Sequence, residues 1–380
     1  MTVIYGSGIH KIHRGIPNTD GNACFMNAAT QLVLNIPAMR NAIMSSSKSD
    51  RITTMTARMA REYAGACDRS CDVFASFHRV MREEFGMYKD SSNQQPSQED
   101  ITEFIDKWLS ALDKPVLRHV SFTVKSVLSH PFLGNRETVE PYTRLSIPVL
   151  PENDIGLAQT PVNLSDLITS TMKHEVVEYN NTTYSKKLCI VTLPDILHVS
   201  INRYTYTDNA AAYIYRPVVY NHILDLSSEM CPSDSVHGGT YRLAGLAIQK
   251  PASKPVRGVT TTSAGHYITI FTDEDDASKT TVYNDDITRP GESLLAYRDN
   301  VYVLVYIRTS RVADYFPKWT TTLPKCETRP PVRYISLGTH VNSEAAGNVL
   351  VTIAVFSGGF FLVALIAACA RGFESACRRK

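Results

Sequence analysis

The chain has 380 residues, enough for one large domain or two ordinary ones, each able to bury a hydrophobic core. Its 39 basic and 37 acidic residues nearly balance and form no polybasic run, which argues against a nucleic-acid partner. Eight cysteines are too sparse for a disulfide-stapled secreted scaffold, and without a CxxC pair they predict reduced thiols in a reducing compartment and no metal site.

The first third of the chain has helical periodicity. Apolar residues recur three and four positions apart in Ala23–Ile36, where Pro37 provides a stop, and in Gln98–Leu112. The segments Ile52–Ala66 and Cys71–Phe85 between them also have a helical pattern. We therefore expect a helical front part.

After Pro115 the sequence changes to short runs rich in Val, Ile, Thr and Tyr, separated by Pro, Asn and Gly. The predicted strands are Ser121–Leu128, Thr143–Val149, Lys187–Thr192, Leu197–Tyr204, Tyr241–Gln249, His266–Thr272, Thr280–Tyr283 and Val301–Arg308. Helices followed by a mostly antiparallel sheet predict an α+β fold.

The C-terminal part has a different composition. Val349–Ala370 is uncharged and long enough to cross the ~30 Å hydrocarbon layer as a helix, whereas a buried core helix usually carries polar residues on one face. We therefore predict a globular domain over residues 1–310, a proline-containing stalk over 311–347, a membrane helix over 348–370 and a short basic tail over 371–380.

The strongest chemical signal lies in Gly15–Asn27, where a polar loop leads into a helix with Cys24 in its first turn. A thiolate is the reactive form of cysteine, and the positive end of a helix dipole favours it. Backbone amides of the loop, together with an Asn side chain, could hold a developing oxyanion. The alternative interpretation is a small buried residue at a helix start.

A cysteine nucleophile needs a base, and His266 is the best candidate among the eleven histidines. Gly265, His266 and Tyr267 open an apolar strand directly after a loop rich in Pro, Gly, Ser and Thr. If the segment that ends in Asp285 and Asp286 pairs with this strand as a hairpin, a carboxylate could orient the imidazole. Asp–Asp pairs also occur in ordinary turns.

These segments together resemble the motifs of ubiquitin-specific proteases. Gly15–Asn27 resembles the family's cysteine box, usually written GLxNxGNTCYMN, and Gln98–Phe104 resembles the glutamine box QDAxEFL. Further segments follow the family's later motifs in order, and the resemblance covers Arg14 to Arg308: Glu140–Pro148, Leu193–Tyr204, Ile223–Leu226, Tyr241–Leu243, Gly265–Tyr267, Asp285–Asp286 and Val301–Arg308.

The resemblance implies a papain-like fold with a helical thumb, a β-rich palm and strand fingers, and it implies no cofactor. It also implies a catalytic triad in which Cys24 is the nucleophile, His266 the base and then the acid, and Asp285 the residue that orients His266. Asp286 would assist, and Asn18 would stabilise the oxyanion.

Residues near the two boxes are expected to bind the substrate: Gln98, Glu99, Asp100, Gly265 and Tyr267. Gln98 would touch the substrate tail or the cysteine loop. The acidic residues Glu99, Asp100 and Glu103 would face the basic C-terminal tail of ubiquitin, or they form a solvated helix face.

Three departures from the family pattern stand out. The loop from Asn18 to Cys24 is one residue longer than usual, so Asn22 is a possible substitute for Asn18. Arg118–Glu140, which corresponds to the fingers, has no cysteine and so no zinc pair. Thr281 replaces the usual tryptophan before the Asp–Asp pair.

The expected partners are ubiquitin, ubiquitinated proteins and, through Val349–Ala370, a membrane. Because no apolar run near the N-terminus suggests a secretory signal, we expect a C-terminal anchor with the catalytic domain in the cytosol. The basic tail favours the opposite orientation, and sequons at Asn163, Asn180 and Asn181 would be unused in the cytosol. Two other functions stay open: an inactive ubiquitin-binding module and a peptidase for a ubiquitin-like modifier.

Overall fold

The computed structural model describes residues 14–64, 71–90, 95–149, 160–173, 175–179, 182–207, 210–232, 238–251, 259–260, 265–272, 279–311, 355–356 and 359–360. The chain divides into two compact units, Met1–Pro324 and Lys325–Lys380. In the second unit the described residues form two short antiparallel strands, β20 (Val355–Phe356) and β21 (Gly359–Phe360).

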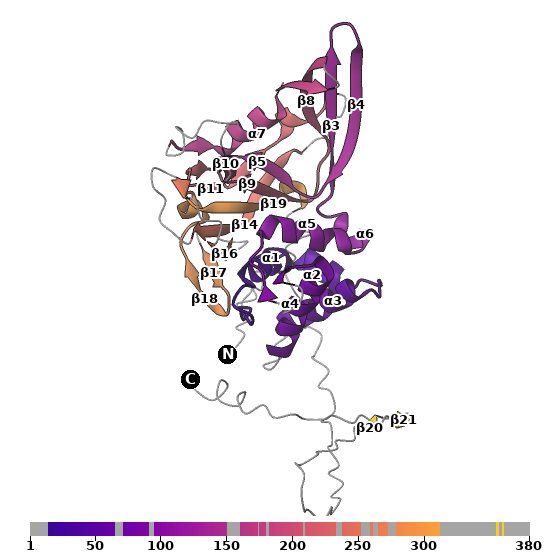
Figure 1. Ribbon diagram of the computed structural model, residues 1–380, viewed down its shortest axis with the longest axis vertical. Coiled ribbons are helices and arrows are strands. Elements are labelled where there is room, and N and C mark those ends of the chain that lie inside the picture. Colours follow the sequence, from indigo (N-terminus) through magenta and orange to yellow (C-terminus); the bar gives the residue numbers. More distant parts are fainter. Residues whose placement is uncertain are drawn as a thin grey trace, which may run out of the picture. The chain divides into compact units, whose positions relative to one another are not determined.

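The first part of unit 1 is a cluster of helices (Figure 1), as the periodicity predicted. They are α1 (Cys24–Leu34), α2 (Pro37–Met44), α3 (Arg51–Ala64), α4 (Cys71–Phe85), α5 (Ile101–Ala111) and α6 (Lys114–Leu117). An aromatic cluster on α4 and α5 fills the centre, where the ring of Trp108 stacks on Phe104 and meets Phe77 edge-on. The helical part therefore has its own aromatic core, which fixes how α4 lies against α5.

The helix boundaries follow local chemistry. Pro37 was predicted to stop the first helix, but α1 already ends at Leu34 and Pro37 begins α2. Proline suits the first position of a helix because the N–H that it lacks would have no partner there. Asp100 caps α5 by accepting hydrogen bonds from the backbone N–H groups of Thr102 and Glu103. The cap shortens the predicted helix Gln98–Leu112 at its start and leaves Gln98 in the preceding loop.

The central sheet of unit 1 is mainly antiparallel, with strand order β18-β17-β16-β14-β19-β9-β5 and with β13 beside β14. Its strands are β5 (Leu145–Pro148), β9 (Ile196–Asn202), β13 (Ile223–Asp225), β14 (Thr240–Pro251), β16 (Gly265–Thr272), β17 (Thr280–Asn284), β18 (Ile287–Gly291) and β19 (Val301–Arg308). One hydrophobic cluster joins the helices to this sheet, and a second cluster joins the sheet to α7 (Leu164–Met172). The sheet is thus buried on both sides, which explains the continuous apolar run of β19.

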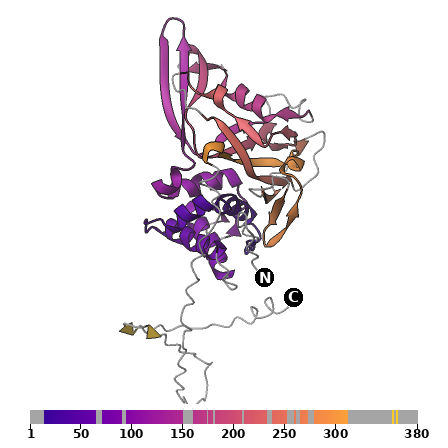
Figure 2. The same cartoon turned by 180° about the vertical axis from the view of Figure 1, so that it is seen from behind.

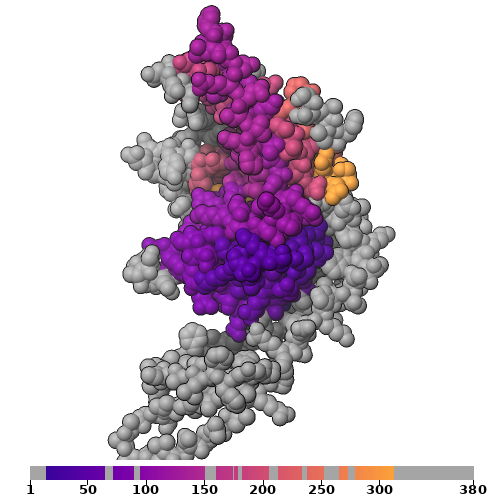
Figure 3. Space-filling model, turned by 90° about the vertical axis from the view of Figure 1, so that its right-hand side faces the viewer, coloured from indigo at the N-terminus to yellow at the C-terminus, as the bar shows by residue number. Residues whose placement is uncertain are grey.

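A second sheet projects from the central sheet, as Figures 1 and 2 show. Its strand order is β4-β3-β8-β7, formed by β3 (Phe122–His130), β4 (Gly134–Tyr142), β7 (Glu175–Tyr179) and β8 (Thr182–Thr192). The space-filling view shows the β3–β4 hairpin rising beyond the helical part (Figure 3). β4 was not predicted, because it is exposed along its whole length and carries no alternating apolar pattern.

The remaining described elements are short. They are β1 (Tyr88–Asp90), β2 (Gln95–Pro96), β6 (Val162–Asn163), β10 (Tyr204–Thr207), β11 (Ala210–Ile214), β12 (Val218–Val219), β15 (Val259–Thr260) and the 3₁₀ turns η2 (Ser227–Glu229), η3 (Leu294–Tyr297) and η4 (Thr309–Arg311).

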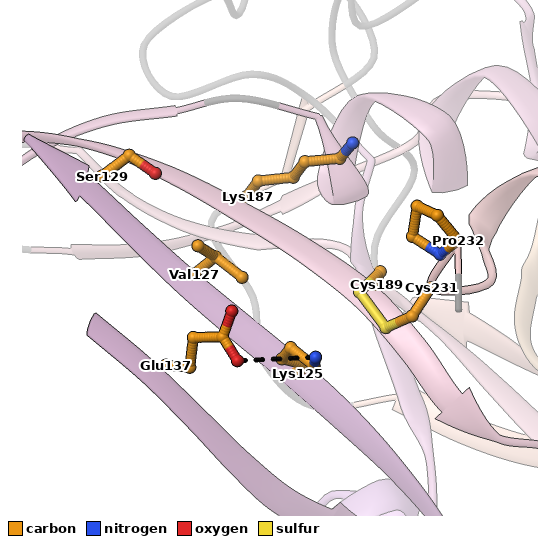
Figure 4. A pocket seen from close by; sticks show the side chains of 8 residues that line it. All are labelled: Lys125, Val127, Ser129, Glu137, Lys187, Cys189, Cys231 and Pro232. Atoms are coloured by element: carbon orange, nitrogen blue, oxygen red, sulfur yellow. Dashed lines mark ion pairs between the residues drawn. A yellow bond between two sulfur atoms is a disulfide. The ribbon is translucent and has the colours of Figure 1, made fainter. Parts of the chain in front are cut away.

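Cys189 and Cys231 form a disulfide, so the prediction of reduced thiols throughout the chain is wrong for this pair. The two cysteines are 42 residues apart in the sequence, so no short spacing pattern predicts that they pair. The fold brings them together because Ile190 on β8 bridges to Met230, and the Cys231 N–H donates to the Ile190 carbonyl. The disulfide borders a pocket that also holds the Lys125–Glu137 ion pair (Figure 4).

Within the described parts of the chain, no helix is both long enough and apolar enough to cross a membrane. The predicted membrane helix Val349–Ala370 and the predicted stalk 311–347 both lie almost wholly outside the described residues. The four described residues of that segment belong to β20 and β21, so the structure gives the predicted helix no support.

Candidate active site

Cys24 is the first residue of α1 and is almost fully buried. The N–H groups of a first helical turn have no partner within the helix, so those at the start of α1 can donate to an anion placed near the Cys24 sulfur. The side-chain amide of Gln98 donates to this sulfur over 3.2 Å. Gln98 therefore contacts Cys24 itself, which agrees with one of the two positions predicted for it.

His266 is the second residue of β16, and β16 pairs with β17 as the predicted hairpin. Its Nε2 lies 2.5 Å from Oδ1 of Asn284, the last residue of β17. A hydrogen bond with Cys24 is the main cause that raises the pKa of His266 to about 9, and the bond with Asn284 and the charge of Asp285 add to it. Because an amide oxygen only accepts, Nε2 carries a hydrogen and Nδ1 is left to face the thiol.

Asp285 was predicted to orient His266, but the structure gives that contact to Asn284. The Asp285 carboxylate instead accepts hydrogen bonds from the side-chain amides of Asn27, over 2.8 Å, and Asn18, over 3.2 Å. Its backbone has a φ of 51°, and its carbonyl accepts from the N–H of Ile16. The left-handed turn at Asp285 rotates its side chain toward the loop before α1 and leaves Asn284 beside the imidazole.

The predicted oxyanion residues both lie in the loop before α1. The side-chain oxygen of Asn18 accepts from the backbone N–H of Ala23, while its side-chain nitrogen donates to Asp285. The Asn22 amide nitrogen donates to the carbonyl of Pro96 over 3.4 Å. The Asn18 amide is thus held by Asp285, directly after β17, and the Asn22 amide by Pro96 of β2, two residues before Gln98.

Asp286, predicted to assist catalysis, is exposed and contacts the loop through its backbone. A Cβ added at Gly15 would lie 2.3 Å from the carbonyl carbon and oxygen of Asp286. Only glycine therefore fits at Gly15, where the chain before Cys24 crosses the turn between β17 and β18.

Three of the predicted substrate-binding residues make contacts within the protein. Tyr267 is buried, and its hydroxyl contacts Gln249 and Asp100, so its side chain does not present a surface to a substrate. Asp100 also caps α5 and accepts from the Tyr302 hydroxyl, so it joins the helices to the sheet. Glu99 accepts from Ser97 and is half-buried.

Gly265, the last predicted contact residue, pairs with Pro251 where β14 ends and β16 begins. A Cβ there would lie 2.7 Å from the Lys250 carbonyl oxygen. Glycine is required at this position by close strand packing, directly before His266.

Comparison with protein families identifies the chain. The family described as ubiquitin carboxyl-terminal hydrolase matches residues 14–306, which include every residue of the site. The chain belongs to this family. The predicted enzyme class, a ubiquitin hydrolase, is confirmed, whereas a comparison with curated proteins finds no match.

Solved structures confirm the fold of the hydrolase. The chain is similar to Ubp8 in "Structure of the SAGA Ubp8/Sgf11/Sus1/Sgf73 DUB module bound to ubiquitin aldehyde", with a TM-score of 0.62 and 16% identity, over 81% of this chain and 72% of that one. A second structure of that module, bound to monoubiquitin, matches with a TM-score of 0.60 and 17% identity, over 81% and 71%. A third, from yeast with a mutant Sgf73, matches with a TM-score of 0.60 and 16% identity, over the same shares.

Several residues of the hydrolase site were missed from the sequence. Asn284 directly precedes the Asp–Asp pair and was passed over because a charged residue was expected beside the imidazole. Asn27 was noted only as part of the cysteine-box motif and was given no role of its own, although its side chain links α1 to Asp285. His78 and Arg82, on α4, gave no signal, because their importance depends on the packing of α4 against the cysteine loop.

The described residues contain no group of three or more His, Cys, Asp or Glu side chains arranged to hold a metal ion. The site brings together a buried thiol, an imidazole with a raised pKa, and several amide donors around one helix N-terminus.

Proposed function

We propose that the hydrolase cleaves the bond after the C-terminal glycine of ubiquitin through a thiol mechanism, with Cys24 as nucleophile and His266 as base and acid. The observation that carries this proposal is the ordered chain from Cys24 to His266 to Asn284, built across α1, β16 and β17. Asn284 is the orienting residue in this proposal. The geometry of nucleophile, base and orienting group is that of a catalytic triad.

The proposed reaction has two halves. The Cys24 sulfur, deprotonated by His266 Nδ1, attacks the carbonyl carbon of the terminal glycine, forms a C–S bond and produces an oxyanion. When the oxyanion collapses, the C–N bond breaks and the imidazolium gives its proton to the leaving amine. Water, deprotonated by His266, then attacks the thioester, and the Cys24 thiolate leaves.

The oxyanion would form at the N-terminus of α1. The backbone N–H groups of the first turn point there, and the Asn18 and Asn22 amides are held on either side by Asp285 and Pro96. An Asn amide nitrogen carries two hydrogens, so each retains one for the oxyanion after its bond to the protein. The one-residue extension of the loop is therefore compatible with catalysis.

Ubiquitin is the substrate in this proposal because the family carries that specificity and similar structures hold ubiquitin or ubiquitin aldehyde. The test is covalent labelling of the full chain by ubiquitin with a thiol-reactive C-terminal group, beside matched reagents made from ubiquitin-like modifiers. We expect an adduct with ubiquitin that is absent in Cys24→Ala and reduced by at least ~10²-fold in rate in His266→Ala.

The controls separate the other two functions. A Cys24→Ala protein that still binds ubiquitin shows that labelling was lost through chemistry rather than unfolding. Wild-type protein that binds ubiquitin without forming an adduct would contradict the thiol mechanism and favour an inactive binding module. Faster labelling by a ubiquitin-like modifier would contradict the assigned substrate.

We also propose that Val349–Ala370 anchors the hydrolase in a membrane with the catalytic domain in the cytosol. The support is its uncharged length and the location of ubiquitin conjugates. The Cys189–Cys231 disulfide and the basic tail are both more typical of the opposite orientation, so the orientation needs its own test.

The full chain, expressed with microsomes, is expected to resist alkaline extraction and to lose its catalytic domain to added protease. A variant lacking residues 349–370 should be released by the same extraction. Glycosylation at Asn163, read as a mass shift removed by endoglycosidase and absent in Asn163→Gln, would contradict a cytosolic domain.

A further inference from the structure

Two side chains of α4 reach into the loop that precedes Cys24. His78 and Arg82 are four residues apart, so they lie on the same face of the helix. They are only 2% and 1% exposed. Neither belongs to the proposed triad, yet a buried arginine and a buried histidine are costly unless each is fully engaged.

Arg82 joins three segments around the nucleophile. Its Nε and Nη2 bind both carboxylate oxygens of Asp20, over 2.7 and 3.1 Å, and Nη2 also donates to the Asn22 carbonyl over 3.0 Å. Its Nη1 donates to the carbonyls of Met87 and Ser97, over 3.1 and 2.8 Å. Ser97 directly precedes Gln98, so one guanidinium fixes the loop before Cys24 relative to the residue that contacts its sulfur.

His78 fixes the same loop from its other side. Its Nδ1 lies 3.0 Å from the Thr19 hydroxyl, and its Nε2 lies 2.8 Å from the Asn27 side-chain oxygen. The amide nitrogen of Asn27 donates in turn to Asp285 and to the Ile16 carbonyl. Burial lowers the pKa of His78 to about 4, so the ring is neutral, donates through Nε2 and accepts from Thr19.

The residues held in this way are those of the extended segment. The loop from Asn18 to Cys24 is one residue longer than the family's pattern, and Thr19 and Asp20 lie in it, followed by Gly21 with a φ of 79°. An added loop residue brings backbone freedom, which must be removed before the amides of the loop can hold a fixed geometry.

We propose that His78 and Arg82 form an α4 clamp, a pair of positioning residues that holds the lengthened loop so that its amides face the oxyanion. The clamp touches neither substrate nor the reacting atoms. It acts through Thr19, Asp20 and the backbone of Asn22, and through Asn27 and Asp285 beyond His78. The proposal rests on the thiol mechanism proposed above.

The test compares two reactions of Cys24 in the full chain. Ubiquitin aldehyde adds to the sulfur and leaves a negatively polarised oxygen at the oxyanion position. Ubiquitin with a C-terminal bromoethyl amide alkylates the sulfur instead: the thiolate displaces bromide, a C–S bond forms, and no oxyanion develops. Both reagents need the same fold, the same thiolate and the same ubiquitin surface, so only the first reports on the position of the loop amides.

We expect Asp20→Asn, Thr19→Val and Arg82→Lys to weaken ubiquitin aldehyde binding and to lower kcat together, by roughly 10- to 100-fold, as for small misplacements in other active sites. The rate of alkylation and KM should stay within about twofold, because neither involves the oxyanion. Arg79→Lys is the matched control, since Arg79 lies on α4 but is exposed.

Thr19→Val and Asp20→Asn alter loop residues that are exposed or half-buried, so they test the clamp even if Arg82→Lys does not fold. An equal fall in aldehyde binding and alkylation would overturn the proposal, because it would show a loss of folded protein alone. No change in either reaction would overturn it as well. A wild-type protein that reacts with neither reagent would refute the thiol mechanism itself, not the clamp.

Discussion

Asn284→Ala is expected to lower kcat/KM for a ubiquitin amide by roughly 10²- to 10⁴-fold, the range found when acid–base catalysis is lost. The Asn284 oxygen is the acceptor that holds His266 Nε2, at 2.5 Å. Without it the ring can rotate or take the other tautomer, and Nδ1 no longer faces the Cys24 sulfur. Steady-state hydrolysis of a fluorogenic ubiquitin amide measures the loss, and thermal unfolding checks that the protein is folded.

The matched variants distinguish Asn284 from its neighbour. Asn284→Asp keeps an oxygen at the same distance, so most of the activity should return. Asp285→Asn places an amide against the amides of Asn18 and Asn27, which disturbs the loop but leaves the His266 contact intact. The assignment is wrong if Asn284→Ala keeps wild-type activity while Asp285→Asn loses it.

Most of the framework of this site could be predicted from the sequence, because each part had a local signal. The periodicity of α1 placed Cys24 at a helix start, and the apolar runs of β16 and β17 placed His266 on a hairpin. The order of short motifs then gave the family, which residues 14–306 confirm. Local pattern is sufficient here because the proposed nucleophile, Cys24, and the proposed base, His266, each lie at the start of a regular element.

The contacts within the site could not be predicted in the same way, because they depend on backbone rotation and tertiary packing. A left-handed turn at Asp285 decides whether Asn284 or Asp285 faces the imidazole. The spacing of residues in the sequence does not predict this backbone conformation. Tyr267 follows His266 in sequence, but strand alternation turns it into the core. The Cys189–Cys231 bond likewise depends on the path of the chain over 42 residues.

The kcat/KM of the hydrolase is expected to fall on the alkaline side with an apparent pKa near 9, the value to which His266 is raised. The hydrogen bond with Cys24 is the first cause, and Asn284 and the charge of Asp285 support it against burial, which lowers the pKa. Below pH 9 the imidazole holds the proton that the leaving amine needs. Above it that proton is lost, and each further pH unit costs about tenfold in rate.

Three variants test the direction of this pKa shift. In Asn284→Ala one raising contribution is lost, so the residual activity should fall off at a lower pH than in the wild type, whereas the added charge of Asn284→Asp should move the limb higher. In Cys24→Ala the main contribution is lost, so the His266 pKa, read from its imidazole nitrogen resonances, should drop below 9. A His266 pKa that is the same with and without the thiol would mean that the two side chains do not share a proton, and the acid step would then need another donor.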